Sequence, residues 1–299
     1  NNVRTKLELS ENGLSTPRRQ SKRRKPSKKK EQVQEPSVVK VERVDDEDSL
    51  NVVFKPNTGP QTDFLAAGER EVLYGGSAGG GKSYAMLADP LRYMGHPSFS
   101  GLLLRHTTEE LRELVWKSQE IYPKIWKGIK WSERKMQWTA PSGARLWMSY
   151  LDRDDDVLRY QGLAFSWIGF DELTQWATPF AWNYMRSRLR TASSDLPIYM
   201  RATTNPGGPG HGWVKKMFID PAPYGKTFDA TDIETGEVLK YPAGHSKAGQ
   251  SLFKRKFIPA RLSDNPYLSR EGDYEAMLLS LPEQQRRQLL EGDWDIKEG

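Results

Sequence analysis

The sequence predicts an α/β fold with a mainly parallel central sheet that is flanked by helices. Apolar segments that read as strands alternate with segments that carry helix signals, and this alternation is typical of parallel sheets covered on both faces. Residues 101–106 and 165–170 are nearly continuous apolar runs, as buried strands require. Residues 141–143, Pro-Ser-Gly, separate two further strand-like segments and predict an antiparallel hairpin in addition.

The predicted elements follow one another from about residue 52 onward. Thr107 is a good N-cap, Glu109 and Glu110 lie near the positive end of the helix it starts, and Pro123 indicates where that helix ends. Strands are expected at residues 71–74, 101–106, 137–139, 145–150, 165–170, 198–203 and 253–259. Helices are expected at residues 83–94, 107–122, 178–190, 271–279 and 282–290.

The charge distribution divides the chain into a tail and one domain. Residues 1–50 hold 13 Lys/Arg against 9 Asp/Glu, a net charge of +4 out of +6 for all 299 residues. Their low apolar content predicts a disordered tail, and residues 51–299 are expected to form the folded domain. Residues 18–30 contain nine basic residues and no acidic one. This run is either a nucleic-acid-binding arm or a solvated tail.

The composition also bears on the expected compartment. The chain has no cysteine, which excludes disulfides and thiolate metal sites. No apolar run approaches the roughly 20 residues of a membrane-spanning helix, and the N-terminal residues lack the apolar core of a signal peptide. We therefore expect no membrane partner and an intracellular location.

A glycine-rich segment lies between the first predicted strand and the first predicted helix. It fits the pattern G-x-x-x-x-G-K-[ST], in which glycines let backbone N–H groups face phosphates and the next helix adds its positive end. The lysine is expected to reach the β- and γ-phosphates, and the final hydroxyl to ligate Mg²⁺. The pattern predicts ATP binding by a P-loop NTPase; the alternative is a flexible linker. The predicted site residues are Gly76, Ser77, Ala78, Gly79, Gly80, Gly81, Lys82 and Ser83.

Two carboxylates follow the apolar strand at residues 165–170. A nucleotide site needs an acidic magnesium partner at the end of a neighbouring strand, and Asp171 is expected to supply it. Glu172 is placed to act as the general base for the attacking water. This pair favours a P-loop NTPase of the ASCE type. The alternative is an acidic helix N-cap at a strand end.

Further polar residues are candidates for sensing the nucleotide. Thr204 and Asn205 end the strand predicted at residues 198–203 and could contact the γ-phosphate or the attacking water, although an Asn-Pro-Gly turn would look the same. Gln61, 21 residues before Lys82, could pair with the N6/N7 edge of adenine. Any glutamine in a loop would fit that last pattern.

In this order, these motifs resemble the large terminase subunit of tailed bacteriophages over residues 54–295. The most specific pieces lie in the C-terminal third of the chain: residues 257–262 with 264–266, and Gly-Asp-Trp-Asp within residues 291–295. The other pieces are residues 59–61, the segment LYGGSAGGGKS at 73–83, Gly162 ahead of residues 170–172, and TTNPGG at 203–208.

The resemblance implies an ATP-hydrolysing motor that moves double-stranded DNA through the portal into a procapsid. It implies a homo-oligomeric ring, typically a pentamer, docked on the portal protein, and a small terminase subunit that selects the viral DNA. The implied location is the host cytoplasm. It also implies that Thr203, Thr204 and Asn205 couple hydrolysis to DNA movement, and that residues 257–266 help close over the nucleotide.

The sequence departs from the family pattern at two positions where an arginine is common. Ala78 stands four residues before Lys82, and Gln161 stands immediately before Gly162. The source of the arginine finger is therefore open. Arg159 is ranked first among the substitutes, and Arg105, at the end of a strand, is ranked second. Either could instead be a surface ion-pair partner.

Family members usually continue into a nuclease domain that holds two metals with clustered carboxylates. Such a cluster is not evident in residues 1–299, so we expect ATP hydrolysis without DNA cleavage. Two other functions stay open at this stage. One is another P-loop DNA motor such as a helicase, and the other is a nucleotide-binding assembly protein without turnover.

Overall fold

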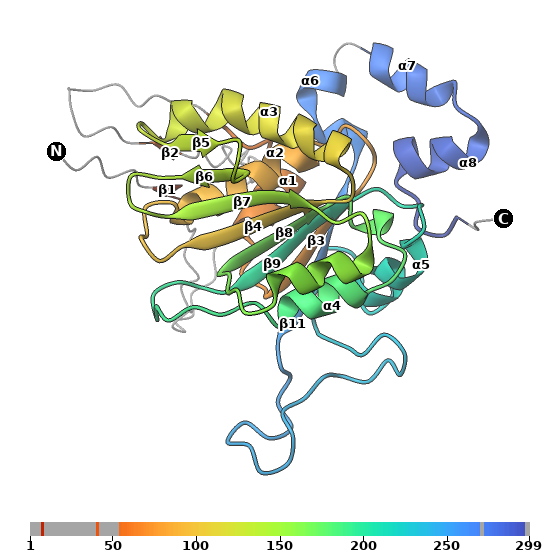
Figure 1. Cartoon of the computed structure of the whole chain (residues 1–299). Coiled ribbons are helices and arrows are strands. Elements are labelled where there is room, and N and C mark those ends of the chain that lie inside the picture. The colour runs from red at the N-terminus through yellow and green to blue at the C-terminus, as the bar shows by residue number, and fades with distance from the viewer. Residues whose placement is uncertain (1–6, 9–39, 42–53, 270–271, 297–299) are drawn as a thin grey trace, which may run out of the picture.

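A twisted sheet with helices on both faces forms the centre of the molecule (Figure 1). The computed structural model describes residues 7–8, 40–41, 54–269 and 272–296. In these residues the main sheet has nine strands in the order β10-β11-β3-β9-β8-β4-β7-β6-β5. The six strands from β11 to β7 are parallel, while β10 at one edge and β6 and β5 at the other are antiparallel additions. The predicted α/β class is confirmed.

Seven of the nine strands of the main sheet lie close to predicted positions, whereas the two edge strands, β5 and β10, were not predicted. The parallel strands are β3 (Glu71–Gly76), β4 (Ser100–Arg105), β7 (Arg145–Tyr150), β8 (Trp167–Asp171), β9 (Tyr199–Thr204) and β11 (Lys254–Ala260). The antiparallel strands are β5 (Lys130–Ser132), β6 (Gln137–Thr139) and β10 (Thr227–Asp229). The predicted hairpin is β6–β7, and it extends the main sheet because β7 also pairs in parallel with β4.

Helices on the two faces bury separate apolar clusters. On one face lie α1 (Pro60–Ala66), α2 (Lys82–Ala88) with the following 3₁₀ turn η1 (Asp89–Tyr93), and α3 (Thr108–Ile125) (Figure 1). The other face carries α4 (Phe180–Arg186), α5 (His211–Val214) and the π-turn η4 (Lys215–Ile219). The 3₁₀ segments η2 (Asp154–Tyr160) and η3 (Leu173–Gln175) follow β7 and β8.

Short helices gather beyond the carboxyl ends of the parallel strands. They are η5 (Leu262–Asp264), α6 (Pro266–Ser269), α7 (Asp273–Leu279), α8 (Glu283–Arg286) and the π-turn η6 (Arg287–Glu291). Figure 1 shows α6, α7 and α8 projecting from this end of the sheet. The predicted helix at residues 282–290 is thus one α-helical turn followed by a π-turn.

Three helix boundaries differ from the prediction. The helix predicted at residues 83–94 is α2, which stops at Ala88 and continues as a 3₁₀ turn, because Pro90 cannot donate the next helical hydrogen bond. The helix predicted at residues 107–122 is α3, which passes through Pro123 to Ile125. Burial of Tyr122 and Ile125 on its apolar face outweighs the one backbone hydrogen bond that Pro123 cannot donate. The helix α4 begins only after Pro179.

The N-cap of α3 is formed as predicted. Thr107 Oγ1 accepts from the Glu110 backbone N–H at 3.3 Å, and a Glu110 carboxylate oxygen accepts from the Thr107 backbone N–H at 3.3 Å. This reciprocal capping box satisfies two donors that the first helical turn leaves open. It fixes the start of α3 three residues after the end of β4.

The prediction of a disordered tail at residues 1–50 falls mostly outside the described residues. Within that range the structure describes only β1 (Leu7–Glu8) and β2 (Lys40–Val41), which pair antiparallel. In the described part of the chain, no helix has the length and apolar character needed to cross a membrane.

Candidate nucleotide site

The glycine-rich segment forms a loop between β3 and α2, at the carboxyl end of β3. Gly79 and Gly81 have φ angles of 75° and 76°, in the left-handed region that side chains disfavour. Lys82 opens α2, and its Nζ donates to Ser77 O at 2.6 Å and to Asn205 Oδ1 at 2.8 Å. The lysine therefore spans its own loop and reaches the end of β9.

The strand register brings the second carboxylate pair beside this loop. Thr203 on β9 pairs with Tyr74 on β3 and with Asp171 on β8. The Asp171 side chain is fully buried, and its Oδ2 lies 3.5 Å from Ser83 Oγ. Thr203 Oγ1 donates to the other oxygen, Oδ1. Two residues 88 positions apart thus meet at one point through the parallel sheet.

Hard oxygen ligands converge where a magnesium ion would be needed. Mg²⁺ prefers oxygen ligands and keeps several waters, with one or two carboxylates and substrate phosphates completing its shell. The Ser83 hydroxyl and the Asp171 carboxylate fit this donor set, and both lie beside the phosphate loop. Arg105, at the end of β4, places its Nε 3.2 Å from Asp171 Oδ2 and balances the buried charge.

Glu172 occupies an unusual position for a non-glycine residue. Its φ and ψ of 61° and 56° are left-handed, a conformation that costs roughly 1–2 kcal/mol and is common at functional sites. Burial raises the pKa of Glu172, and the charge of Asp171 raises it further, against the opposing charges of Lys82 and Arg105. A carboxylate with a raised pKa is better matched to accepting a proton near neutral pH.

The lysine is perturbed by the same environment. Burial lowers the pKa of Lys82, and the carboxylates Glu172 and Asp171 act in the opposite direction. Bound phosphates would add further negative charge around this ammonium group and favour its charged form.

Thr204 and Asn205 join β9 to the segment after Glu172. Thr204 Oγ1 lies 2.7 Å from Thr174 Oγ1 and accepts from the Thr174 backbone N–H at 3.2 Å. Thr174 Oγ1 also donates to Asn205 O at 3.1 Å. The Asn205 side chain holds Lys82, so a movement of the lysine would reach the loop that follows Glu172.

A cavity of about 390 Å³ opens above the phosphate loop. One wall, the sheet wall, comes from residues 78–83 of the loop together with Glu172 and Asn205. The opposite wall, the helical wall, consists of Glu113 and Lys117 from α3 and Asn265, Leu268 and Tyr274 from the short C-terminal helices; Tyr84 also lines the cavity. Among the helical-wall residues, only Asn265 lies in a segment that the sequence singled out, residues 257–266; no motif marks the others.

Eight of the predicted site residues line this cavity, whereas Gly76, Ser77, Asp171, Thr204, Gln61 and Arg159 do not. Gln61 is buried in α1, where its Nε2 donates to Gly81 O at 2.9 Å and its Oε1 accepts from the Asn57 backbone N–H at 2.6 Å. An adenine that paired with Gln61 would have to replace both bonds. Arg159 lies on η2 and forms an ion pair with Asp156 at 3.0 Å. Of the two arginines considered, Arg105 contacts the site carboxylate Asp171, whereas Arg159 contacts Asp156, which does not line the cavity.

Residues near the C-terminus form hydrogen bonds with the first residues of the phosphate loop. Ser77 Oγ donates to Leu290 O at 2.7 Å, and the Ala78 backbone N–H donates to Leu289 O at 2.7 Å. Gly292 lies so close that a Cβ there would meet the Ser77 nitrogen at 2.7 Å. We call residues 287–294 the C-terminal strap. Its anchor is Trp294, which is buried and stacked on His211 with ring centroids 5.3 Å apart.

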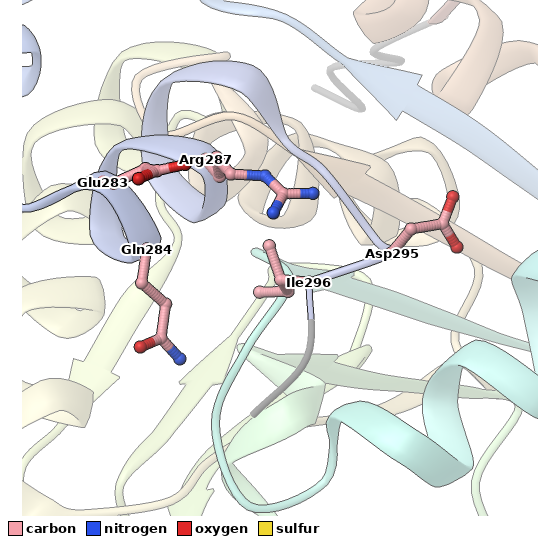
Figure 2. Close-up of a pocket in the computed structure, with 5 residues that line it drawn as sticks. All are labelled: Glu283, Gln284, Arg287, Asp295 and Ile296. Carbon is pink, nitrogen blue, oxygen red and sulfur yellow. The ribbon is translucent and has the colours of Figure 1, made fainter. Parts of the chain in front are cut away.

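A second cavity of about 430 Å³ lies beside this strap (Figure 2). Figure 2 shows the Arg287 guanidinium above Ile296, whereas the Asp295 carboxylate points away and Gln284 extends to the other side. Arg287 Nε donates to Asp293 Oδ2 at 2.8 Å within the strap. The lining residues are Glu283, Gln284, Arg287, Asp295 and Ile296. Its polar groups serve the strap, and we assign it no ligand.

A parallel sheet that carries a phosphate loop after β3, with Asp171 and Glu172 at the end of the next strand but one, β8, defines a P-loop nucleoside-triphosphate-binding domain. The comparison with known families is more specific. Residues 73–299 match the family described as terminase large subunit, T4likevirus-type, N-terminal, and the chain belongs to this family. The resemblance read from the motifs is confirmed.

Solved structures of phage terminases share the fold. The chain matches the large terminase of a thermophilic bacteriophage with 16% identity and a TM-score of 0.57, covering 82% of this chain and 55% of that one. The ADP complex of the same thermophilic phage protein matches with 15% identity and a TM-score of 0.55, covering 80% of this chain and 53% of that one. The large terminase ATPase domain of Thermus phage P74-26 matches with 14% identity and a TM-score of 0.51, covering 81% of this chain and 94% of that one. No curated protein matches.

The chain therefore spans about half the length of the thermophilic phage terminase and nearly all of the isolated P74-26 ATPase domain. In the part of the chain that the structure describes, no group of three or more His, Cys, Asp or Glu residues could hold a metal ion.

Proposed function

We propose that this chain is the ATP-hydrolysing motor of a viral terminase, which translocates double-stranded DNA into a procapsid through the portal. Membership of the terminase large-subunit family supports the DNA-packaging role. The observation that carries the ATPase assignment is the meeting of Lys82, Ser83, Asp171 and Glu172 at one cavity edge, through parallel strands that are far apart in sequence.

The proposed chemistry follows from the contacts around the loop. The backbone N–H groups of the phosphate loop and the start of α2 bind the phosphates, and Lys82 neutralises the β- and γ-phosphate charge. Ser83 and Asp171 hold the Mg²⁺ ion, which would offset charge on the phosphate oxygens. Glu172 faces the cavity from the end of β8 and accepts the proton of the attacking water; its raised pKa supports this role.

Asn205 and Thr204 would report the state of the nucleotide. Asn205 Oδ1 accepts from Lys82 Nζ, and Thr204 is bonded to Thr174, two residues after Glu172. Loss of the terminal phosphate would remove a negative charge beside Lys82 and change its contacts. The hydrogen bonds from Lys82 through Asn205 would carry this change into the segment after β9. This gives a physical route from hydrolysis to movement.

The partners of the motor are part of the proposal. They are double-stranded viral DNA, the portal protein, a small terminase subunit and further copies of the chain in a ring, with the complex acting at the procapsid in the host cytoplasm. Arg105 is occupied by Asp171, and Arg159 by Asp156. In such a ring the arginine finger would come from a neighbouring copy of the chain, and Arg159 of that copy is a candidate.

The decisive experiment is Glu172→Gln. We expect ATP binding to be retained and hydrolysis to fall about 10²–10⁴-fold, the usual contribution of a general base. Calorimetric titration with ATP and Mg²⁺ and a phosphate-release assay with DNA measure the two effects. Hydrolysis that is unaffected would remove Glu172 as the base.

The same preparation separates the competing functions. A wild-type chain that binds ATP but never hydrolyses it, even with DNA and portal present, would be an assembly protein. Strand separation on a forked duplex would indicate a helicase. Movement along intact duplex without strand separation is the result that the motor predicts.

A further inference from the structure

The cations around the nucleotide cavity are unequal in how firmly they are held. Among the described residues that line the cavity, the cationic side chains are Lys82 and Lys117, and no arginine lines it. Lys82 is buried and bonded to Ser77 and Asn205. Lys117 is more accessible and bonded to a single carboxylate of its own helix, Glu113. Lys117 is therefore the cation with capacity for another anion.

The position of α3 places Lys117 on the carboxylate side of the cavity. The helix starts three residues after Arg105, whose guanidinium contacts Asp171. Its ion pair with Lys117 lowers the pKa of Glu113, and the Arg105 charge acts in the same direction. Glu113 and Lys117 also line the same cavity as Ser83 and Glu172, which are proposed to bind the metal ion and the attacking water. A terminal phosphate would lie in this cavity.

The contact that now holds Lys117 is weak enough to exchange. Its Nζ lies 2.5 Å from Glu113 Oε1, one helical turn away, and 5.7 Å from the centre of the Tyr84 ring. The Lys117 side chain is 28% exposed and that of Glu113 is 58% exposed. An exposed pair of this spacing is weak, whereas a charge-assisted bond to a phosphate is several times stronger. A triphosphate would therefore displace Glu113 from the lysine.

We infer that Lys117 is a further phosphate-contacting residue, which leaves Glu113 and binds the terminal phosphate of the nucleotide in the same chain. It would supply in cis part of the positive charge that an arginine at position 78 or 161 would give. Ala78 and Gln161 stand at those positions here. The inference rests on the proposed ATPase function and adds a residue, and a specificity for triphosphate over diphosphate, to the same site.

The test compares ATPγS with ADP, because only the former carries a terminal phosphate. In Lys117→Ala we expect ATPγS affinity in Mg²⁺ buffer to fall about 10–100-fold, the equivalent of one charge-assisted bond. ADP affinity should change less than about twofold. Lys117→Arg should retain most of the preference for ATPγS. Glu113→Gln should tighten ATPγS binding, since it frees the lysine. Equal losses for both nucleotides, or none, would overturn the inference.

Two controls isolate the effect. Lys124→Ala removes an exposed lysine from the same helix, outside the cavity, and should leave both affinities unchanged. Lys82→Ala should weaken both nucleotides, since it lies at the loop itself. If Lys82→Ala leaves binding intact, the proposed nucleotide site fails; if only Lys117→Ala has no effect, the site stands and the role of Lys117 fails.

A mixing experiment separates cis from trans action. Lys117→Ala subunits keep Glu172, and Glu172→Gln subunits keep Lys117. If the lysine acts within its own chain, mixed assemblies should show no more phosphate release than the sum of the two variants. Turnover restored by mixing would mean that Lys117 reaches a neighbouring subunit's nucleotide, and the cis assignment would be wrong.

Discussion

The two walls of the nucleotide cavity are built in different ways. The sheet wall stands on β3, β8 and β9, whose residues are buried throughout. Its Lys82 bonds to Asn205, and its Ser83 lies within hydrogen-bond distance of Asp171. The helical wall comes from α3 and from short helices beyond the strand ends, and its residues are partly exposed. Buried parallel strands fix positions closely, whereas short helices with few buried residues open at low cost.

This difference suggests a division of labour. In the proposed mechanism Lys82 and Glu172 must hold fixed geometry, and both are on the sheet wall, with Asp171 at the end of β8 beside them. Groups that could exchange partners as nucleotide enters and leaves, such as Lys117, are on the helical wall. The C-terminal strap connects the two, because it bonds to the phosphate loop and follows directly after the short helices.

Breaking the sheet wall should have the largest effect. In Lys82→Ala we expect ATP turnover to fall at least about 10²–10³-fold, the loss seen when a preorganised electrostatic group is removed. Folding should be retained, because burial lowers the pKa of Lys82 and its charge is costly to bury in the nucleotide-free chain. Phosphate release and thermal unfolding measure the two effects. Turnover near the wild-type rate would show that the sheet wall does not carry the chemistry.

Disturbing the strap should have an intermediate effect. Gly292 has a φ of 64°, and a Cβ would meet the Ser77 nitrogen at 2.7 Å. We expect Gly292→Ala to destabilise the chain by about 1–3 kcal/mol through left-handed strain and overpacking, and to weaken ATP binding by moving the loop. Urea unfolding and nucleotide titration are the measurements. Gly236→Ala, with a φ of 72° and open space around it, is the matched control for strain alone.

The smallest effect concerns stability and pH. Because burial raises the folded-state pKa of Glu172 above its ordinary 4.5, the folded chain keeps a proton that the unfolded chain has lost, and stability falls as pH rises through this interval. Removing the carboxylate in Glu172→Gln should therefore stabilise the nucleotide-free chain above the raised pKa, by about 1.4 kcal/mol per unit of pKa shift.

This gain should vanish at pH 4 and below, where the carboxyl group is protonated in both states. Urea unfolding of both proteins across this pH range tests it. A constant difference at all pH values would mean that the buried charge of Glu172 does not set the difference.

The motif residues and the parallel sheet could be predicted from sequence because their signals are local. A phosphate loop needs its glycines and lysine at fixed spacing, and a carboxylate pair that follows an apolar strand lies at the sheet edge in any parallel fold. The partners of Gln61 could not be predicted in this way. Its amide contacts Gly81 and Asn57 because α1, which carried no strong helix signal, packs beside the loop.

The sequence by itself determined the α/β class and the family, and it predicted Lys82, Ser83, Asp171 and Glu172 as members of one nucleotide site. Only the tertiary structure decided that Arg105 contacts Asp171, that Lys117 faces the cavity, and that residues 289 and 290 bind the loop. The physical reason is distance along the chain. Motif residues meet through regular strand pairing, whereas these contacts depend on how helices and turns pack from the side, which no local spacing records.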